Sequence, residues 1–366
     1  MEKICFIINS LQNAGPVTVL YEIIRGLDNN RFSPFIVVLK KEIPQNTRLS
    51  DFEKIGCKIK QFGFSFIDLE IKTRKCAQNV SEYLIEQSIT VTHLHGYHPV
   101  IISKYFDNSI KTIVTFHNIC GVDFVKSKGL LIGKYMVLRY LKSAKKIKYL
   151  VGISHYTSDY YEKKLKRNVI TIPNGVDFSK FIKCSEKEKE RLRQEYKIPI
   201  GKKIYTIIGV GKKVKNIPFI LNCIKKTKLI DTLFLFIGTG PMIEKYKCIA
   251  QNLDNCLFLG RRNDVEKILQ MSDFYISASK SEGFGLSAVE ALITGNTILY
   301  SDIPTYREIF YSIPELREFM FSLKDISKLC SLLMSGKKID NYNYIRNMFY
   351  NKYSNAIMSK QYQELY

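Results

Sequence analysis

Two glutamates, Glu282 and Glu290, flank a glycine-containing turn in the stretch SEGFGLSAVEALITG at 281–295. The apolar run FYISAS at 274–279 predicts a buried strand before the turn, and LSAVEALI predicts a helix capped by Gly295. The first backbone N–H groups of such a helix have no intrahelical acceptor and attract phosphate. A carboxylate accepts hydrogen bonds from neighbouring hydroxyls. The pattern therefore predicts a nucleotide-sugar site, with phosphates at the helix start, sugar hydroxyls on Glu282 and ribose hydroxyls on Glu290.

The alternative is that Glu290 is a solvated helix residue and Glu282 an ordinary loop acid, since two glutamates at this spacing recur by chance. The context favours the ligand site. Three further loop-like motifs precede it in order: PNGVD at 173–177, FIGTGP at 236–241 and LGRRNDV at 259–265.

The elements that must position these loops form two rounds of apolar runs alternating with helical stretches, which predicts the α/β class with parallel sheets covered on both faces. The expected strands lie at 3–9, 32–39, 91–96, 112–118, 149–154 and 169–175, and then at 204–211, 233–240, 256–260, 274–279 and 297–302. The charged segment 184–203 separates the rounds. We expect two doubly wound domains facing across a cleft, 1–182 and 183–345, and a last helix, 346–366, that returns to the first.

Composition narrows the class of protein. The chain has 366 residues, 46% hydrophobic, without an apolar run long enough to span a membrane or a signal peptide at its start. Nine scattered cysteines without a CxxC motif favour free thiols and a cytoplasmic location. The net charge of +22 favours a polyanionic partner, either nucleic acid or an anionic membrane surface.

Several function classes lack their motifs. No complete GxGxxG follows a strand and no GxxxxGK[ST] occurs, which disfavours dinucleotide dehydrogenases and P-loop enzymes. Nucleic-acid binding fits the charge, but the chain has no Trp, no zinc spacing and no helix-turn-helix signature. His93, His95 and His98 are spaced as metal ligands could be, but no acid or cysteine cluster accompanies them, and the chain has no Asp-x-Asp. We expect no metal and no cofactor.

The set of motifs resembles the family 4 glycosyltransferases, retaining enzymes of the GT-B fold. The resemblance rests on ITIPNGVDFSKF, FIGTGP, LGRRNDV and SEGFGLSAVEALITG, and SNAIMSKQYQELY at the end is similar to the last helix of that family. It implies two Rossmann-like domains and transfer of a sugar from a nucleotide-diphosphate donor.

The resemblance also implies roles for residues of the second domain. Glu290 would hold the ribose, and Glu282 the donor sugar near its C3 and C4 hydroxyls. A basic pair would neutralise the leaving diphosphate; in GVGKKVKN it corresponds to Lys212 and Lys215, with Lys213 as the alternative for the first. The family has an Arg in a longer loop here, so these lysines could instead be surface residues of the loop with no role in binding. The remaining implied substrate contacts are Gly283, Phe284, Gly285, Leu286, Asn174, Gly240 and Arg262.

In the first domain the resemblance is weaker. The family has a Gly-Gly loop where this chain has only Gly15 followed by Pro16. His117 matches a family histidine that approaches the C6 region of the donor sugar, although a hydrogen-bonded loop histidine explains it equally well. His95 could face the acceptor. No residue is a clear general base; the family mechanism has the leaving phosphate take the proton of the acceptor.

A basic stretch without acids runs from 124 to 158 and contains eight Lys and Arg residues. As a helix it has an apolar side and a largely basic side opposite, with Leu138 and Leu141 among the charges. The apolar side holds Met136, Val137, Tyr140, Ala144 and Ile147, and the basic side holds Lys134, Arg139, Lys142, Lys145 and Lys146. This pattern suits a helix lying on an anionic membrane, and an ordinary amphipathic helix packed on the sheet fits equally. The basic residues are Lys126, Lys128, Lys134, Arg139, Lys142, Lys145, Lys146 and Lys148.

The sequence thus predicts a retaining, metal-independent hexosyltransferase. It would move a hexosyl or N-acetylhexosaminyl group from a UDP-sugar to a saccharide or lipid-linked acceptor in surface polysaccharide biosynthesis, in the cytoplasm or at the cytoplasmic face of the membrane. Two alternatives stay open, a catalytically silent partner subunit and a basic nucleic-acid-binding protein. The sugar, linkage, acceptor and oligomeric state are not encoded in any motif.

Overall fold

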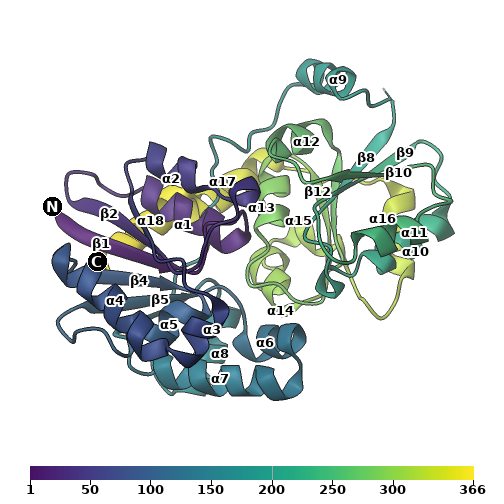
Figure 1. Ribbon diagram of the computed structural model, residues 1–366. Coiled ribbons are helices and arrows are strands. Elements are labelled where there is room, and N and C mark those ends of the chain that lie inside the picture. The colour runs from purple at the N-terminus through teal and green to yellow at the C-terminus, as the bar shows by residue number, and fades with distance from the viewer. Residues whose placement is uncertain (200) are drawn as a thin grey trace. The chain divides into compact units, whose positions relative to one another are not determined.

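The computed structural model describes residues 1–199 and 201–366 and divides into two compact units (Figure 1). Unit 1 contains Met1–Gly175 and Asn355–Tyr366, and unit 2 contains Val176–Ser354. The expected limits were 1–182, 183–345 and 346–366. The later limit differs because α17 stays with unit 2, and the chain returns to unit 1 only after the extended backbone of Ser354 ends that helix.

Unit 1 is built on a parallel sheet of seven strands in the order β3-β2-β1-β4-β5-β6-β7. The strands are β1 Glu2–Ile8, β2 Phe32–Val38, β3 Lys58–Gln61, β4 Val91–His95, β5 Lys111–Phe116, β6 Tyr149–Gly152 and β7 Ile170–Thr171. The helices are α1 Gly15–Arg25, η1 Pro44–Asn46, α2 Leu49–Lys54, α3 Phe66–Ile71, α4 Thr73–Glu86, α5 Tyr97–Ser103, α6 Cys120–Lys128, α7 Leu130–Ala144, α8 His155–Leu165 and α18 Asn355–Gln363.

Unit 2 has a second parallel sheet, in the order β10-β9-β8-β11-β12-β13. The strands are β8 Lys203–Ile208, β9 Thr232–Ile237, β10 Cys256–Gly260, β11 Phe274–Ser277, β12 Thr297–Ser301 and β13 Met320–Phe321. The helical segments are α9 Glu186–Glu195, η2 Lys213–Lys215, α10 Ile217–Thr227, α11 Ile243–Ile249, α12 Val265–Met271, α13 Leu286–Ile293, α14 Pro304–Tyr306, η3 Arg307–Tyr311, α15 Pro314–Arg317, α16 Ser327–Ser335 and α17 Tyr342–Tyr353.

The expected α/β class and parallel sheets are confirmed, and each predicted strand has a counterpart. The two strands that the sequence analysis missed, β3 and β13, lie at sheet edges. β3 has the sequence KIKQ and is largely exposed, so it lacks the apolar run that marks a buried strand, and β13 has only two residues.

The C-terminal segment is tied to the sheet of unit 1. α18 packs on α1, as Figure 1 shows, and the Ser359 hydroxyl donates to the Ile23 carbonyl at 2.9 Å. Beyond it, the Tyr362 hydroxyl lies 2.8 Å from the hydroxyl of Thr115 in β5, and the Tyr366 hydroxyl lies 2.8 Å from Nδ1 of His93 in β4. These buried hydrogen bonds fix the end of the chain against the middle strands.

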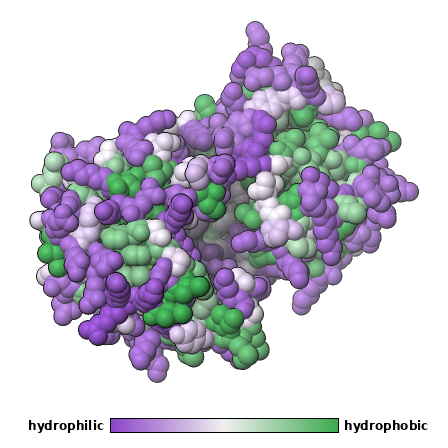
Figure 2. Space-filling view, viewed as in Figure 1, coloured by the Kyte–Doolittle hydropathy of each residue, from purple (hydrophilic) through white to green (hydrophobic). Residues whose placement is uncertain are grey.

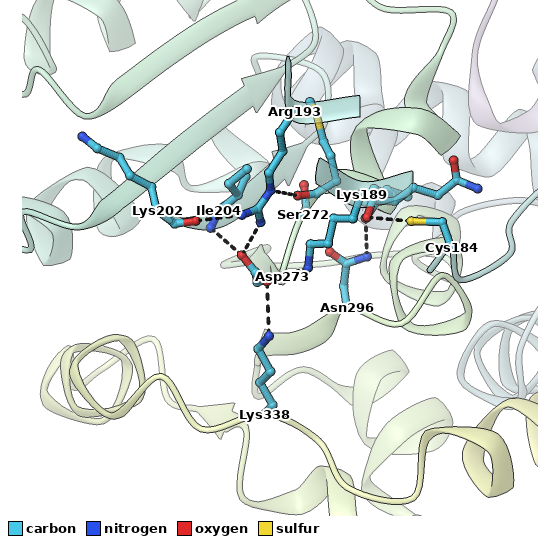
Figure 3. A network of polar contacts seen from close by, with 12 residues as sticks. Cys184, Lys189, Arg193, Lys202, Ile204, Ser272, Asp273, Asn296 and Lys338 are labelled. Carbon is cyan, nitrogen blue, oxygen red and sulfur yellow. Dashed lines mark hydrogen bonds and ion pairs between the residues drawn. The ribbon is translucent and has the colours of Figure 1, made fainter. Parts of the chain in front are cut away.

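Unit 2 is anchored by a buried carboxylate, Asp273, just before β11 (Figure 3). Its Oδ1 lies 2.6 Å from Nζ of Lys189 and 3.2 Å from Nζ of Lys338. Its Oδ2 accepts from Arg193 at 2.8 Å and from the backbone N–H of Ile204 at 2.9 Å. One side chain thus joins α9, β8 and the segment before α17 to the start of β11. Burial alone would raise the pKa of Asp273, but Lys189, the Ile204 N–H and Arg193 outweigh it and lower the pKa to about 2.

We expect Asp273→Asn to lower the free energy of unfolding at pH 7 by about 3–5 kcal/mol, because it leaves buried cations without their partner. The depressed pKa makes this contribution present above the unfolded-state pKa of about 3.9 and lost as the pH falls towards 2. Urea unfolding at pH 7 and pH 3 should therefore show a smaller difference from wild type at pH 3. The exposed Asp254→Asn is the control. An equal loss at both pH values would contradict a role for the charge of Asp273.

None of the helices in the described part of the chain combines the length and the apolarity needed to cross a membrane.

Candidate functional site

The candidate site of unit 2 is formed by the loops that follow β8 and β11. These strands are neighbours in the middle of the sheet, and the chain crosses from one side of β8 to the other between them. Ligands of doubly wound sheets bind at such a switch point, beyond the carboxyl ends of the strands. The backbone N–H of Lys280 donates to the Val214 carbonyl at 2.8 Å and joins the two loops directly.

The loop after β8 packs against the loop after β9 through glycines. Gly211 donates its N–H to the Thr239 carbonyl at 3.0 Å. A Cβ atom on Gly238 would lie 2.1 Å from the carbonyl oxygen of Gly209, and one on Gly240 would lie 2.7 Å from the nitrogen of Gly211. The backbones approach so closely that a side chain does not fit. This packing gives Gly240, predicted as a substrate contact, a structural reason to be glycine.

Glu282 lies in the loop after β11 and is held by three neighbours. Its Oε1 lies 2.7 Å from Nζ of Lys215 and accepts from the Ser279 hydroxyl at 2.6 Å. Its backbone carbonyl accepts from the Thr305 hydroxyl at 2.7 Å. The structure therefore brings together two residues to which the sequence analysis gave separate roles, Glu282 for the sugar and Lys215 for the diphosphate. Ser279 and Thr305 were not predicted, because a single hydroxyl residue carries no signal in the sequence.

The three predicted lysines of the loop after β8 differ in their surroundings. The aliphatic part of Lys215 packs on Gly209, where a Cβ atom would lie 2.8 Å from the Lys215 Cε, and its ammonium group is half-buried against Glu282. Lys212 and Lys213 are exposed. Of the three, Lys215 is therefore the one whose charge the fold itself positions.

The turn between β11 and α13 has the predicted form. Gly285 stands at the N-cap of α13 with φ +90°, and a Cβ atom there would lie 2.5 Å from the Tyr306 ring, so both backbone and space require glycine. The Phe284 ring is buried and packs edge-on against Tyr353, so only its backbone can face a ligand. Leu286 begins the helix, and Gly283 within the turn is buried.

Glu290 is the fifth residue of α13 and is half-buried, a turn and a half beyond the N-terminus as predicted. The helix ends as predicted too: Gly295 adopts φ +97° just after it. The structure thus confirms the strand–turn–helix that carries the two glutamates, while their ligand contacts stay predictions.

Arg262 in the loop after β10 is engaged within the protein. Its Nε donates to Oδ1 of Asp264 at 2.8 Å in a bidentate ion pair, and the Tyr196 hydroxyl also donates to this carboxylate. The Arg262 contact is the main cause that lowers the pKa of Asp264 to about 2. A direct contact from Arg262 to substrate stays a prediction, and the pair gives it a role in ordering the loop.

Unit 1 places His95 and His117 together at the carboxyl edge of its sheet. His95 ends β4, His117 follows β5, and Nδ1 of the first lies 2.9 Å from Nε2 of the second. Gly15 starts α1, and a Cβ atom there would meet no atom within 4 Å, so the fold does not require glycine. Asn174 is buried, and its Oδ1 has no hydrogen-bond partner among the described residues.

A polar cluster beside this edge was not predicted. Nδ1 of His98 lies 3.2 Å from Oδ1 of Asn9, and its Nε2 lies 3.0 Å from Oε1 of Glu70. The other carboxylate oxygen of Glu70 pairs with Arg139, which also donates to Thr73 at 2.6 Å. The periodicity of the basic stretch predicts Arg139 on the basic side of its helix, facing outward. That placement is wrong, because the Glu70 carboxylate draws the side chain inward.

Comparison with known proteins agrees with this geometry. The sequence pattern of the family described as Glycosyl transferases group 1 matches residues 188–312, and that of Glycosyltransferase Family 4 matches residues 14–180. The chain belongs to the family 4, group 1 glycosyltransferases. The resemblance of the motifs is thereby confirmed, and the chain is a glycosyltransferase.

Among curated relatives, the O-antigen biosynthesis glycosyltransferase WclY of Escherichia coli is 23% identical over 377 residues, covering 100% of this chain and 98% of WclY. An Escherichia coli UDP-Gal:alpha-D-GlcNAc-diphosphoundecaprenol alpha-1,3-galactosyltransferase is 26% identical over 252 residues, covering 64% of this chain and 63% of that enzyme.

Among solved structures, Anabaena HepE in complex with UDP and glucose matches with a TM-score of 0.79 at 12% identity, covering 100% of this chain and 99% of that chain. A sucrose-phosphate synthase from Thermosynechococcus elongatus matches with a TM-score of 0.81 at 14% identity, covering 100% and 98%. These likenesses confirm the GT-B fold of the glycosyltransferases.

We expect Lys215→Met and Glu282→Gln each to lower the free energy of unfolding by about 1–3 kcal/mol, because each leaves a half-buried charge without its partner. The double variant should lose less than the sum, with a coupling energy of about 0.5–3 kcal/mol in a urea-unfolding cycle. The exposed pair Lys337 and Glu318, also 2.7 Å apart, is the matched control and should couple by about 0.2–1 kcal/mol. Additive losses for the first pair would contradict its role in holding the two loops.

Proposed function

We propose that this glycosyltransferase moves a hexosyl or N-acetylhexosaminyl group from a UDP-sugar to a saccharide or lipid-linked acceptor in surface polysaccharide biosynthesis. The observation that carries the proposal is the pairing of Glu282 with Lys215 beside the N-terminus of α13, with Glu290 on that helix. The names of relatives that make O-antigen or extend a diphosphoundecaprenol-linked sugar support the pathway. The solved complex of HepE with UDP and glucose supports the donor class.

In the proposed reaction the bond between the anomeric carbon and the diphosphate oxygen breaks, and an acceptor hydroxyl bonds to the same face of that carbon. The leaving phosphate oxygen takes the hydroxyl proton, so configuration is retained and atoms and charge balance. Lys215, with the exposed Lys212 or Lys213, neutralises the charge that develops on the diphosphate. Lysines act here as point charges, whereas an arginine would bind bidentately. The lack of an Asp-x-Asp motif supports a reaction without a metal.

The test is thermal stabilisation of wild type and Glu290→Ala by UDP, GDP, ADP and their sugars at moderate salt. At one hundred times its dissociation constant, a ligand that binds only the folded state stabilises it by about 2.7 kcal/mol. We expect selective stabilisation by UDP and a UDP-sugar, unchanged by EDTA because the lysines replace a metal, and its loss in Glu290→Ala. The matched control is Glu244→Ala on α11, whose exposed carboxylate should not matter.

Equal, weak shifts with every polyanion would overturn the donor-site assignment. They would favour the silent partner subunit, or nucleic-acid binding if an oligonucleotide gave the larger shift. Stabilisation by UDP that disappears with EDTA would instead contradict the metal-free reaction alone.

A lipid-linked acceptor requires access to a membrane surface, and unit 1 has a suitable face. In α7 the apolar side chains Leu131, Tyr135 and Leu138 are exposed, Leu131 to 84% and Leu138 to 70%. Their spacing of four and three residues places them along one stripe of the helix. Lys134 and Lys142 are exposed one turn to either side of Leu138. Figure 2 shows hydrophobic side chains gathered over the region of α6 and α7.

The short helix α3 extends this face. Ile67 and Ile71 are exposed on it one turn apart, and the Lys128 ammonium lies 5.4 Å from the centre of the Phe66 ring, which joins α3 to the end of α6. The ion pair between Glu70 and Arg139 joins α3 to α7. We call this the apolar–basic face; its members are Phe66, Ile67, Ile71, Leu130, Leu131, Ile132, Tyr135 and Leu138, with Lys126, Lys128, Lys134, Lys142, Lys145 and Lys146.

We propose that the apolar–basic face binds an anionic lipid bilayer. Exposed apolar side chains enter the boundary between headgroups and acyl chains, and the surrounding lysines each contribute about 1 kcal/mol near an anionic surface. The basic stretch predicts Leu138 and Leu141 as the exposed apolar members of this surface. The prediction is wrong for Leu141, which is half-buried against the core of unit 1. Leu130–Ile132 and the residues of α3 are further exposed members that the sequence did not indicate. The alternative interpretation, an amphipathic helix packed on the sheet, applies to the opposite side of α7, where Met136, Tyr140 and Ala144 are buried.

We expect the double variant Leu131→Gln, Leu138→Gln to bind vesicles of phosphatidylglycerol and phosphatidylethanolamine at least tenfold more weakly in co-sedimentation, since burying one leucine contributes about 1.5–3 kcal/mol. Ile230→Gln in unit 2 is the matched control, because Ile230 is equally exposed but lies outside the face. Binding of wild type should weaken as the salt concentration rises and strengthen as the fraction of anionic lipid rises. Binding that is independent of anionic lipid, or equal in both variants, would refute the proposal.

A further inference from the structure

The imidazole rings of His95 and His117 contact one another through one nitrogen each, and they differ in how deeply they are buried. Besides the 2.9 Å contact between Nδ1 of His95 and Nε2 of His117, the rings are stacked with centroids 5.2 Å apart. His95 is 1% exposed, and its Nε2 is buried without a hydrogen-bond partner among the described residues. His117 is half-buried, and its Nδ1 likewise has no partner in the described part of the chain.

Both imidazoles are neutral at physiological pH. Burial lowers the pKa of His95 well below its usual value, with His93 and His117 adding to the effect. Burial lowers the pKa of His117 to about 4. Each ring therefore carries one proton, and in the shared hydrogen bond one nitrogen must donate while the other accepts.

Only two arrangements satisfy this bond. If Nε2–H of His117 donates, then His95 carries its proton on Nε2, where a buried N–H has no acceptor. If Nδ1–H of His95 donates, its Nε2 is a bare lone pair, and His117 carries its proton on Nδ1. Buried N–H donors without an acceptor are rarer in proteins than acceptors that lack a donor. The second arrangement is therefore the more stable.

We propose that His95 is a positioning residue that fixes His117 in the Nδ1–H tautomer. His117 then offers a hydrogen-bond donor, which suits a hydroxyl or phosphate oxygen of the substrate; this use of the donor rests on the proposed function. The pairing itself does not. The role differs from the direct acceptor contact that the sequence analysis considered for His95, because the buried ring acts through His117.

The arrangement of the neighbouring strands makes the pair rigid. His95 is opposite Thr115 in the β4–β5 register, so β4 and β5 carry the two rings side by side. The ring of His93, two residues earlier, lies against that of His95 with centroids 4.3 Å apart and planes tilted by 39°. Hydrogen bonds of 2.8 Å each to Thr115 and Tyr366 hold His93 in place. The rotamer of His95 is thereby limited, as positioning of a partner requires.

The decisive measurement is the tautomer of each histidine by two-bond proton–nitrogen NMR spectra of protein labelled with 15N-histidine, at pH 7 and without ligand. The chain has only five histidines, and single variants assign them. We expect His117 protonated on Nδ1 in wild type, and a shift towards the Nε2–H tautomer in His95→Phe, which keeps an aromatic ring but removes the donor. His117 protonated on Nε2 in wild type would overturn the proposal, even if the variant does not fold.

Ligand binding adds a readout that a purely structural role would not move. With UDP, His95→Phe and His117→Gln should be stabilised like wild type, whereas affinity for UDP-glucose or UDP-galactose, whichever wild type prefers over UDP, should fall about two- to tenfold, the loss of one neutral hydrogen bond. The exposed His155→Gln is the control. If His117 has the Nδ1–H tautomer but neither UDP nor a UDP-sugar stabilises the protein, the pairing of His95 with His117 still holds. That result would contradict the proposed donor site instead.

Discussion

The ion pair between Lys215 and Glu282 is the interaction on which the candidate site depends. The two residues stand 67 positions apart, and they meet because β8 and β11 are neighbours in a parallel sheet whose carboxyl ends share one edge. Without the pair, a half-buried carboxylate and a half-buried ammonium group would each lose their partner beside the start of α13. The pair therefore fixes both the geometry of the two loops and the balance of charge at the place where a diphosphate would bind.

Close packing of backbone supports this pair from below. Gly209 leaves room for the stem of Lys215, and Gly238 leaves room for the carbonyl of Gly209, so the loops after β8 and β9 are stacked without side chains between them. Asp273 acts at the opposite end of β11, where it binds the N–H of Ile204 at the start of β8. The two strands that carry the site are thus held at both ends. The buried charge of Asp273 holds them at their starts, and the packing of glycines holds the loops at their carboxyl ends.

Local sequence patterns predicted most of the fold. They could not predict which side chains distant in the sequence contact one another. Apolar runs located the buried strands, whereas β3 escaped because an exposed edge strand needs no such run. The turn and helix around Glu282 and Glu290 followed from Gly285 and Gly295, whose positive φ the structure confirms. The contact of Glu282 with Lys215, and that of Arg139 with Glu70, depend on side chains meeting across elements. A pattern of residue types along one helix cannot contain that information.

The pairing of Lys215 with Glu282 also bears on how a donor would enter under the proposed roles. A diphosphate carries more charge than the carboxylate, so it competes with Glu282 for the Lys215 ammonium. If Lys215 turned to the phosphate, the oxygen of Glu282 that it left would become an acceptor for a sugar hydroxyl, while the hydrogen bond from Ser279 would keep the carboxylate in place. Binding of the diphosphate and recognition of the sugar would then be one exchange of hydrogen bonds. In that scheme the nucleotide alone leaves Glu282 short of a partner, and the sugar completes the site.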